Sequence, residues 1–314
     1  MLTSPRLNYF HSLGSHGFHR VAYTEWGSPY SNHLVVCAHG LTRNSRDFDE
    51  LAENLAWHGR RVACIDVVGR GRSDWLEHKE DYGFALYVSD AAAFIARVTA
   101  PAGGYLGALL RRLLGPRKAR TVDWIGTSMG GLIGMMLAAK PDSPIRRLVL
   151  NDVGPLVPWP ALVRLKLTTA GAGAGFAGLD EVESHLRSAC ATFGPLSDSQ
   201  WRRLAEHGSQ LGEDGRYRLA YDPAIVSAMR RAGNAGVEFG SDFLFGIDLW
   251  PVWDAVKCPT LVLRGKESDL LLESTARQMQ SRGPGAEVVE IPGVGHAPWL
   301  MSEDQIEIVR RFLG

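Results

Sequence analysis

The sequence predicts an α/β protein in which helices cover both faces of a mostly parallel central sheet and a helical cap is inserted. Residues 34–38 form a continuous apolar run, which is typical of a parallel strand buried on both faces. Further strand-like runs alternate with helix-like segments, and this alternation indicates a parallel sheet. Residues 154–254 interrupt the alternation with several successive helix-like segments, which predicts the insertion.

The predicted elements of the main domain follow in chain order. Strands are expected at residues 18–26, 33–38, 61–67, 122–125, 147–151, 259–265 and 287–291. Helices are expected at residues 46–57, 81–98 and 132–140, the second of them beginning at the acidic Asp81. A chain of 314 residues fits one elaborated domain with one insertion. We therefore divide it into a core, residues 1–153 and 255–314, and a cap, residues 154–254.

The cap is expected to be mainly helical. Helices are predicted at residues 180–193, 197–207 and 222–231, and a run of small residues at 168–175 is typical of a hinge or loop. The region is rich in aromatic side chains: Trp159, Trp201, Phe239, Phe243, Phe245, Trp250 and Trp253. We expect most of them to form the cap's own core.

A second segment, residues 101–120, is longer than the connection between a helix and a strand requires. Residues 105–114 have helical apolar spacing, and three basic residues follow without an acidic one. A docked surface helix with a solvated basic edge is the preferred interpretation. Binding to a membrane surface or an anionic partner is the alternative.

The composition is ordinary for a soluble globular protein, with 45% hydrophobic and 22% charged residues. Lys+Arg and Asp+Glu both number 34, and no nucleic-acid-binding motif is present, so no nucleic-acid partner is expected. No signal peptide and no stable membrane insertion are predicted. Three of the cysteines Cys37, Cys64, Cys190 and Cys258 lie in or beside predicted core strands as small apolar groups, and a reducing cytoplasm is the expected setting. No Cys-x-x-Cys spacing is present, so no metal is expected.

The segment Gly126-Thr127-Ser128-Met129-Gly130 is the most informative motif. It lies directly between a predicted strand and a predicted helix. A sharp strand-to-helix turn strains the residue at its corner, so the residues two positions away must be nearly free of side chain. The turn presents the Ser128 hydroxyl at its tip, and the following helix directs its N-terminal amides there. This context predicts a nucleophile rather than a plain glycine-rich turn.

A serine hydroxyl is a poor nucleophile unless a base accepts its proton. Asp269 follows the predicted strand 259–265, and His296 lies in the Gly/Pro-rich loop after the strand 287–291. Open parallel sheets build their sites at these carboxyl ends of strands. We expect Asp269 to orient His296, and His296 to activate Ser128. Asp152, which also follows a predicted strand, and Glu267 are the alternative acids.

Four motifs together resemble the α/β-hydrolase superfamily, over almost the full length of the chain. They are His39-Gly40 after the strand 33–38, the glycine-rich run at 69–73, the Ser128 motif, and the late pair Asp269 and His296. The resemblance implies the α/β-hydrolase fold and a serine carboxylesterase activity. It also implies that the cap covers the serine, where it would exclude water and shape the pocket.

The resemblance further implies an oxyanion hole formed by backbone amides. The residues that match the family's positions are Leu41, which follows His39-Gly40, and Met129, which follows the nucleophile. Fixed amides in a dry site stabilise the charge that develops at the tetrahedral stage. We expect His39 to hold its loop by a hydrogen bond. The run at 69–73 lacks the ending of a phosphate-binding loop, so a tight turn is expected there.

The predicted function is hydrolysis of carboxylic esters through an acyl-enzyme, without a cofactor. The substrate is expected to be a small to medium ester, such as a hydroxyacid ester or a polyester oligomer. A carboxylate nucleophile is absent at position 128, which disfavours haloalkane dehalogenases and epoxide hydrolases. The alternatives are a carbon–carbon bond hydrolase or lactonase with the same triad, and a slow-turnover ligand receptor of this fold. A monomer or homodimer is expected.

Overall fold

The computed structural model describes residues 4–100, 121–161, 164, 175–226 and 247–314. In this part of the chain, eight strands form one sheet in the order β1-β2-β4-β3-β5-β6-β11-β12. Their bounds are β1 (Arg6–Gly14), β2 (Gly17–Trp26), β3 (Leu34–Ala38), β4 (Arg61–Ile65), β5 (Val122–Thr127), β6 (Ile145–Asn151), β11 (Thr260–Gly265) and β12 (Glu287–Ile291). β2 pairs antiparallel with β1 and β4, and the other neighbours pair parallel. The predicted mostly parallel sheet is confirmed.

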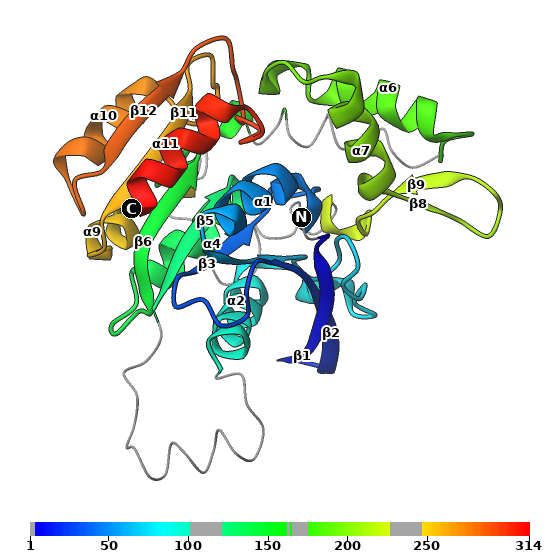
Figure 1. The fold of residues 1–314 in the computed structure, drawn as a ribbon, viewed down its shortest axis with the longest axis horizontal. Coiled ribbons are helices and arrows are strands. Elements are labelled where there is room, and N and C mark those ends of the chain that lie inside the picture. The colour runs from blue at the N-terminus through cyan, green and yellow to red at the C-terminus, as the bar shows by residue number, and fades with distance from the viewer. Residues whose placement is uncertain (1–3, 101–120, 162–163, 165–174, 227–246) are drawn as a thin grey trace.

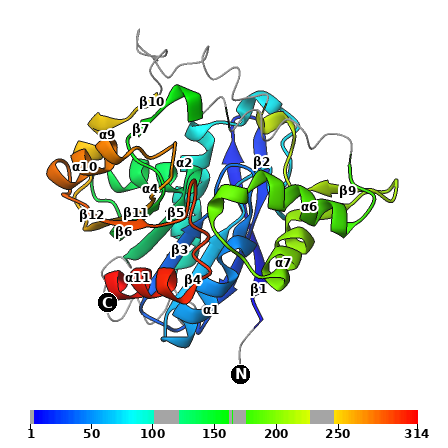
Figure 2. The ribbon, with the colours of Figure 1, turned by 90° about the horizontal axis from the view of Figure 1, so that it is seen from above.

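Helices cover both faces of this sheet (Figure 1, Figure 2). The helices on one face are α1 (Asp49–Trp57) and α11 (Glu303–Leu313); those on the other are α2 (Phe84–Thr99), α4 (Met129–Ala138), α9 (Trp250–Ala255) and α10 (Glu273–Ser281). Side chains of a strand alternate between its two faces. In β3, Val35 and Cys37 join the apolar cluster under α1 and α11, whereas Val36 and Ala38 join the cluster under α2 and α4. Burial on both faces explains the continuous apolar run.

The insertion between β6 and β11 forms a layer of its own, which contains α6 (Leu179–Ala189), the short 3-10 helix η4 (Ala191–Phe193) and α7 (Asp198–Gly208). A hairpin of β8 (Ser209–Leu211) and β9 (Tyr217–Leu219) follows them, and Figure 1 shows these elements together on one side of the molecule. Val182, Leu186 and Leu204 pack around Trp201 to form a separate apolar cluster. The cap helix predicted at 197–207 is therefore present as α7, whereas the one predicted at 180–193 is divided into α6 and η4.

The cap contacts the main domain at several places. Within the insertion, β7 (Leu156–Val157) pairs antiparallel with β10 (Ile247–Asp248). At its far end, Gly71 N donates to Ala220 O at 2.7 Å and Asp222 N donates to Gly69 O at 2.8 Å. The glycine-rich run at 69–73 thus forms the predicted tight turn, and it pairs with the end of the cap.

Some expectations differ from the structure. β1 was not predicted. α2 begins at Phe84, with Gly83 as N-cap, because Asp81 belongs to a separate short 3-10 helix, η2 (Lys79–Asp81). Trp253 is fully buried in the cluster under α4 and not in the cap's own core. The boundaries of the core and cap stay a prediction, although α9 spans the residue at which we divided them.

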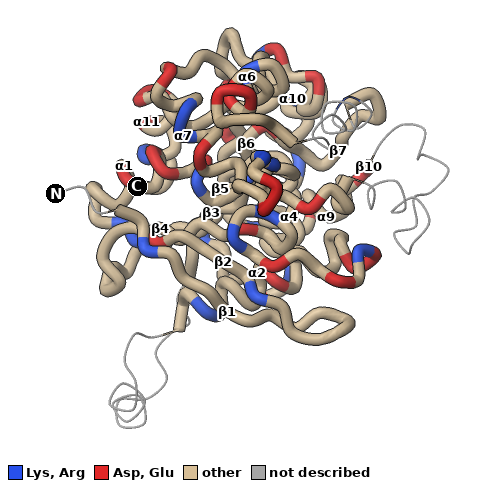
Figure 3. The backbone as a smooth tube through the Cα atoms, turned by 90° about the vertical axis from the view of Figure 1, so that its right-hand side faces the viewer, with Lys and Arg blue, Asp and Glu red and all other residues tan. Residues whose placement is uncertain are grey.

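Several expectations concern residues outside the described part. These are the helix and basic edge within 101–120, most of the small-residue run at 168–175, the aromatic residues at 239, 243 and 245, and the last part of the helix at 222–231. Within the described ranges, no helix has the length and apolarity needed to cross a bilayer. Acidic and basic positions are interspersed along the described backbone (Figure 3).

Candidate active site

The turn from β5 into α4 places Ser128 in a strained conformation, with φ 51° and ψ −116°. A residue with a side chain rarely adopts a positive φ, so the surrounding structure must enforce it. Gly126 and Gly130 allow the turn to close. A β-carbon on Gly126 would lie 2.3 Å from the carbonyl carbon of Gly130, and one on Gly130 would lie 2.0 Å from the carbonyl oxygen of Ala38. The spacing of the motif therefore reflects a true steric requirement.

Three side chains that lie far apart in the sequence meet at this turn. Nε2 of His296 lies 2.9 Å from Oγ of Ser128. Nδ1 of the same ring lies 2.7 Å from Oδ2 of Asp152. His296 and Asp152 are both buried. A ring that donates through Nδ1 to a carboxylate presents Nε2 as an acceptor, so it can receive the serine proton.

The prediction that Asp269 orients His296 is wrong. The carboxylate of Asp269 is half exposed and pairs with Arg164, whose Nη2 lies 2.7 Å from Oδ1 of Asp269. In the same loop, Ser268 is buried and directs its hydroxyl inward to Oδ2 of Asp152, at 2.6 Å. The loop after β11 thus turns Ser268 toward the site and Asp269 away from it.

Asp152 is held in place by the end of β11 and the loop after it, the same loop that contains Asp269. It has a φ of 54° and follows β6 directly. Its Oδ1 accepts a hydrogen bond from the backbone N–H of Gly265 at 2.7 Å. Glu267, the weaker alternative, accepts from the backbone of Gly293 at 3.2 Å instead. Of the three acids considered from the sequence, Asp152 alone contacts His296.

Asn151 links the two loops that carry Ser128 and His296. Its Nδ2 donates to Oγ1 of Thr127 at 3.0 Å and to the carbonyl oxygen of Pro298 at 2.8 Å. The side chain is fully buried. Sequence reasoning missed this role; the one available signal was a polar residue at the end of an apolar strand.

His39 holds the loop that leads to Leu41. Its Nδ1 donates to the carbonyl oxygen of Gly40 at 2.7 Å, and its Nε2 accepts from the backbone N–H of Val67 at 3.0 Å. Complete burial lowers the pKa of His39 to about 3. The ring is therefore neutral at pH 7, as its acceptor role requires. This geometry matches the loop-fixing role predicted for His39.

Arg70 connects the loop of Leu41 with the helix that begins at Met129. It is fully buried, and its Nε donates to the carbonyl oxygen of Leu41 at 2.8 Å. Its Nη2 lies 3.5 Å from Sδ of Met129, and its guanidinium stacks over the ring of Tyr87, 4.7 Å from the centroid. From the sequence, Arg70 was only one residue of a tight turn. Its burial and its partners could not be predicted.

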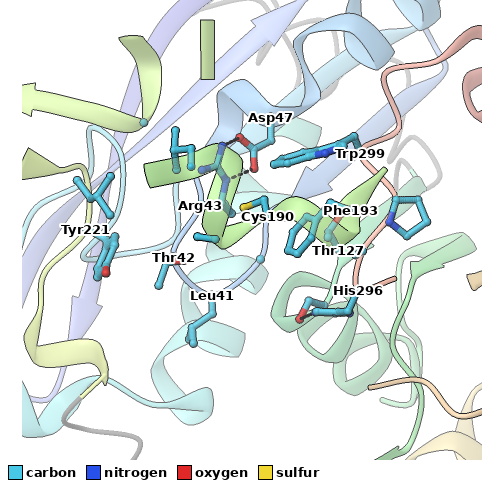
Figure 4. Close-up of a pocket in the computed structure, with 18 of the residues that line it drawn as sticks. Leu41, Thr42, Arg43, Asp47, Thr127, Cys190, Phe193, Tyr221, His296 and Trp299 are labelled. Carbon is cyan, nitrogen blue, oxygen red and sulfur yellow. Dashed lines mark hydrogen bonds and ion pairs between the residues drawn. The ribbon is translucent and has the colours of Figure 1, made fainter. Parts of the chain in front are cut away.

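Ser128 and His296 open into a cavity of about 110 Å³ between the main domain and the cap. Leu41, Thr42 and Arg43 line it from the loop after β3, and Cys190 and Phe193 line it from the cap (Figure 4). Burial raises the pKa of the Cys190 thiol to about 11. This thiol is therefore protonated at neutral pH and is a poor nucleophile.

The comparisons with known proteins agree with this geometry. Residues 35–311 match the alpha/beta hydrolase family. The chain belongs to this family. This hydrolase is 40% identical over 315 residues to a 3-hydroxybutyrate-oligomer hydrolase of Cupriavidus necator, covering 99% of each chain. It is 28% identical to an esterase of Mycobacterium tuberculosis, covering 92% of this chain and 84% of that one.

Solved structures give the same result. An alpha/beta hydrolase from Novosphingobium aromaticivorans has a TM-score of 0.78 to this hydrolase and 33% identity, covering 100% of this chain and 99% of that chain. A hydrolase from Rickettsia typhi has a TM-score of 0.82 at 27% identity, covering 99% of both chains. The predicted superfamily, fold class and enzyme class, an ester hydrolase, are confirmed.

Proposed function

We propose that this hydrolase cleaves esters of hydroxyacids, in particular oligomers of 3-hydroxybutyrate or of closely similar hydroxyacids. The hydrogen-bonded series Ser128, His296, Asp152 is the observation that carries the reaction type. The full-length similarity to a 3-hydroxybutyrate-oligomer hydrolase supports the substrate class.

In the proposed mechanism, Oγ of Ser128 attacks the ester carbonyl while Nε2 of His296 takes its proton. Asp152 holds the ring through Nδ1 and stabilises its cationic form. The carbon–oxygen bond to the alcohol then breaks, and the alcohol leaves with the proton from His296. A water molecule, activated by the same nitrogen, releases the acid and restores Ser128.

We propose the backbone amides of Leu41 and Met129 as the oxyanion hole. Among the described residues, neither N–H donates a hydrogen bond to another backbone or side-chain acceptor. Both residues belong to segments that His39 and Arg70 hold in place. Donors fixed before the reaction stabilise the developing negative charge without having to reorganise.

The remaining expectations about partners and location stay proposals. They are a monomer or homodimer, the absence of a nucleic-acid partner, and the cytoplasm as compartment. Carbon–carbon bond hydrolysis, lactone hydrolysis and slow ligand reception use the same triad, and no described contact favours one of them over ester hydrolysis.

The experiment is a turnover assay of the purified protein with the linear dimer and trimer of 3-hydroxybutyrate, together with p-nitrophenyl esters from acetate to decanoate. We expect many turnovers per minute, release of 3-hydroxybutyrate, and loss of both activities in Ser128→Ala. A single slow burst on every ester would instead support the receptor. Rapid turnover of p-nitrophenyl esters without cleavage of the dimer or trimer would overturn the proposed substrate class.

A further inference from the structure

An arginine, Arg43, lines the cavity two positions after the proposed oxyanion-hole residue Leu41. The guanidinium of Arg43 donates from Nε to Oδ2 of Asp47 at 2.8 Å and from Nη2 to Oδ1 at 2.7 Å. It also lies over the ring of Trp299, 5.4 Å from the centroid. Figure 4 shows Arg43, Asp47 and Trp299 together on one side of the cavity. These contacts fix the orientation of a cation in the substrate cavity.

One edge of this guanidinium has no partner in the described part of the chain. Both oxygens of Asp47 accept from Nε and Nη2 of Arg43. Nη1 of Arg43 donates to none of the described residues. A β-carbon on Gly208 would lie 3.8 Å from Nη1, and the absence of a side chain there leaves space beside it. The side chain of Arg43 is only 13% exposed. Because Arg43 lines the cavity, this N–H edge is available to a ligand oxygen, which would accept a charge-assisted hydrogen bond from it.

The arginine lies close to the nucleophile. A β-carbon on Gly40 would be 3.8 Å from Cβ of Ser128 and 3.9 Å from Cγ of Arg43. The stem of Arg43 and the serine therefore lie on the same side of the loop, separated by one small residue. A ligand whose ester reaches Ser128 has its neighbouring groups within reach of this guanidinium.

Each arginine of the cavity lining is paired with a carboxylate, but the lining itself holds more of the arginines than of their acidic partners. Two arginines, Arg43 and Arg164, belong to the described lining, but the lining contains one carboxylate, that of Asp47. Asp269, which pairs with Arg164, lies outside it. Burial lowers the pKa of His185, another lining residue, so its ring adds no positive charge at neutral pH. A neutral ester has no use for a fixed guanidinium, whereas a carboxylate forms charge-assisted hydrogen bonds with it.

We infer that Arg43 binds the free carboxylate of the substrate and thereby selects the ester bond next to the carboxyl end of a hydroxyacid oligomer. This inference rests on the proposed function. In such an oligomer the terminal carboxylate belongs to the alcohol side of the last ester bond. Attack by Ser128 breaks that carbon–oxygen bond, and the hydroxyacid anion leaves with a proton from His296. The enzyme then shortens oligomers by one unit from the carboxyl end.

The test compares the linear dimer of 3-hydroxybutyrate with its methyl ester, which has the same inner ester bond but no charge. The quantity is the ratio of kcat/KM for cleavage of the inner bond in the free acid to that in the methyl ester. In the wild-type protein we expect the ratio to exceed about ten, because a hydrogen bond to a charged group contributes roughly 1.5–3 kcal/mol. The preference should arise mainly in KM and weaken as salt concentration rises.

Two substitutions and a control assign the preference to Arg43. Arg43→Gln should lower the ratio about tenfold or more, and Arg43→Lys, which keeps the charge, should lower it less. The control is Arg46→Gln, because Arg46 also pairs with an aspartate close by, Asp49 at 2.6 Å, but does not line the cavity. Its ratio should equal that of the wild type. Because the ratio is taken within each protein, a general loss of stability or activity cancels.

The outcomes separate the two proposals. Equal cleavage of the acid and the methyl ester by the wild type would overturn the role of Arg43 and leave the proposed function standing. A preference for the acid that persists in Arg43→Gln, or disappears instead in Arg164→Gln, would also overturn it. If the wild type cleaves p-nitrophenyl butyrate but neither form of the dimer, the proposed substrate class is wrong and the inference falls with it.

Discussion

The hydroxyl of Ser268 lies 2.6 Å from Oδ2 of Asp152, the same carboxylate oxygen that faces Nδ1 of His296 at 2.7 Å. One oxygen thus receives hydrogen bonds from two side chains that come from different loops. The backbone N–H of Gly265 holds the other oxygen. The carboxylate has little freedom to rotate, so it presents a fixed acceptor to the imidazole.

The first prediction concerns the acid. Asp152→Asn should reduce kcat for p-nitrophenyl butyrate by about 10⁴, because the amide no longer stabilises the correct tautomer or the cationic ring. Asp269→Asn should change kcat by less than about threefold, because a half-exposed ion pair contributes little. Steady-state kinetics of both variants measures this. A severe defect in Asp269→Asn with an active Asp152→Asn would return the acid to position 269.

The second prediction concerns Ser268. Ser268→Ala removes one hydrogen bond to the carboxylate but leaves those of Gly265 and His296. We expect kcat to fall about tenfold with KM unchanged, since a hydrogen bond to a charged group contributes roughly 1.5–3 kcal/mol. Ser268→Thr, which restores a hydroxyl, should recover part of the loss. Equal losses in both variants would show that the effect is one of packing and not of the hydrogen bond.

The third prediction concerns Arg70. Arg70→Met keeps much of the apolar stem but removes the hydrogen bond to the carbonyl oxygen of Leu41. We expect kcat to fall by about tenfold or more, because donors that are no longer fixed stabilise the oxyanion less. The matched control is Arg72→Met in the same turn, whose side chain is exposed. The value of kcat, measured at saturating substrate, distinguishes the two variants. Thermal unfolding of each variant checks that it is folded. Equal kcat values in the two variants would exclude a role for Arg70.

The fourth prediction follows from the pKa of His39, which is about 3 in the folded protein against an ordinary value of 6.5. Between these values the unfolded chain binds a proton that the folded chain does not. Acidification from pH 6.5 toward pH 3 therefore destabilises the folded state, by up to about 1.4 kcal/mol per pH unit from this group. Above pH 6.5 the contribution does not change with pH.

Comparison of the wild type with His39→Asn isolates this contribution, because asparagine does not titrate. Urea unfolding at pH 7, 6, 5 and 4 gives the free energy of unfolding of each protein. The variant is expected to be less stable at pH 7, yet its stability should fall less steeply with acid. If the free energy of unfolding falls equally with acid in the two proteins, His39 takes up its proton in the folded chain as readily as in the unfolded chain, and the prediction is wrong.

Much of the main domain was predictable because its signals are local. The apolar run that became β3, the helix after Ser128 and the cap helices each follow from neighbouring residues. β1 was missed because an antiparallel edge strand is stabilised by its pairing with β2, with which it shares nine register positions. The sequence did not single out Trp253 as a member of the main core, because sequence order near a domain boundary does not say which layer buries a side chain.

The sequence by itself determined the strained turn at Ser128 and the glycine-rich turns, because a strained corner requires Gly126 and Gly130 beside Ser128 whatever the rest of the chain does. It also predicted that His296 would meet Ser128. The choice between Asp152 and Asp269 was decided only by tertiary structure. Both acids follow neighbouring parallel strands, so spacing and order admit either. The conformation of one loop turns Ser268 inward and Asp269 toward Arg164, and the packing of that loop against His296 depends on contacts between residues more than a hundred positions apart.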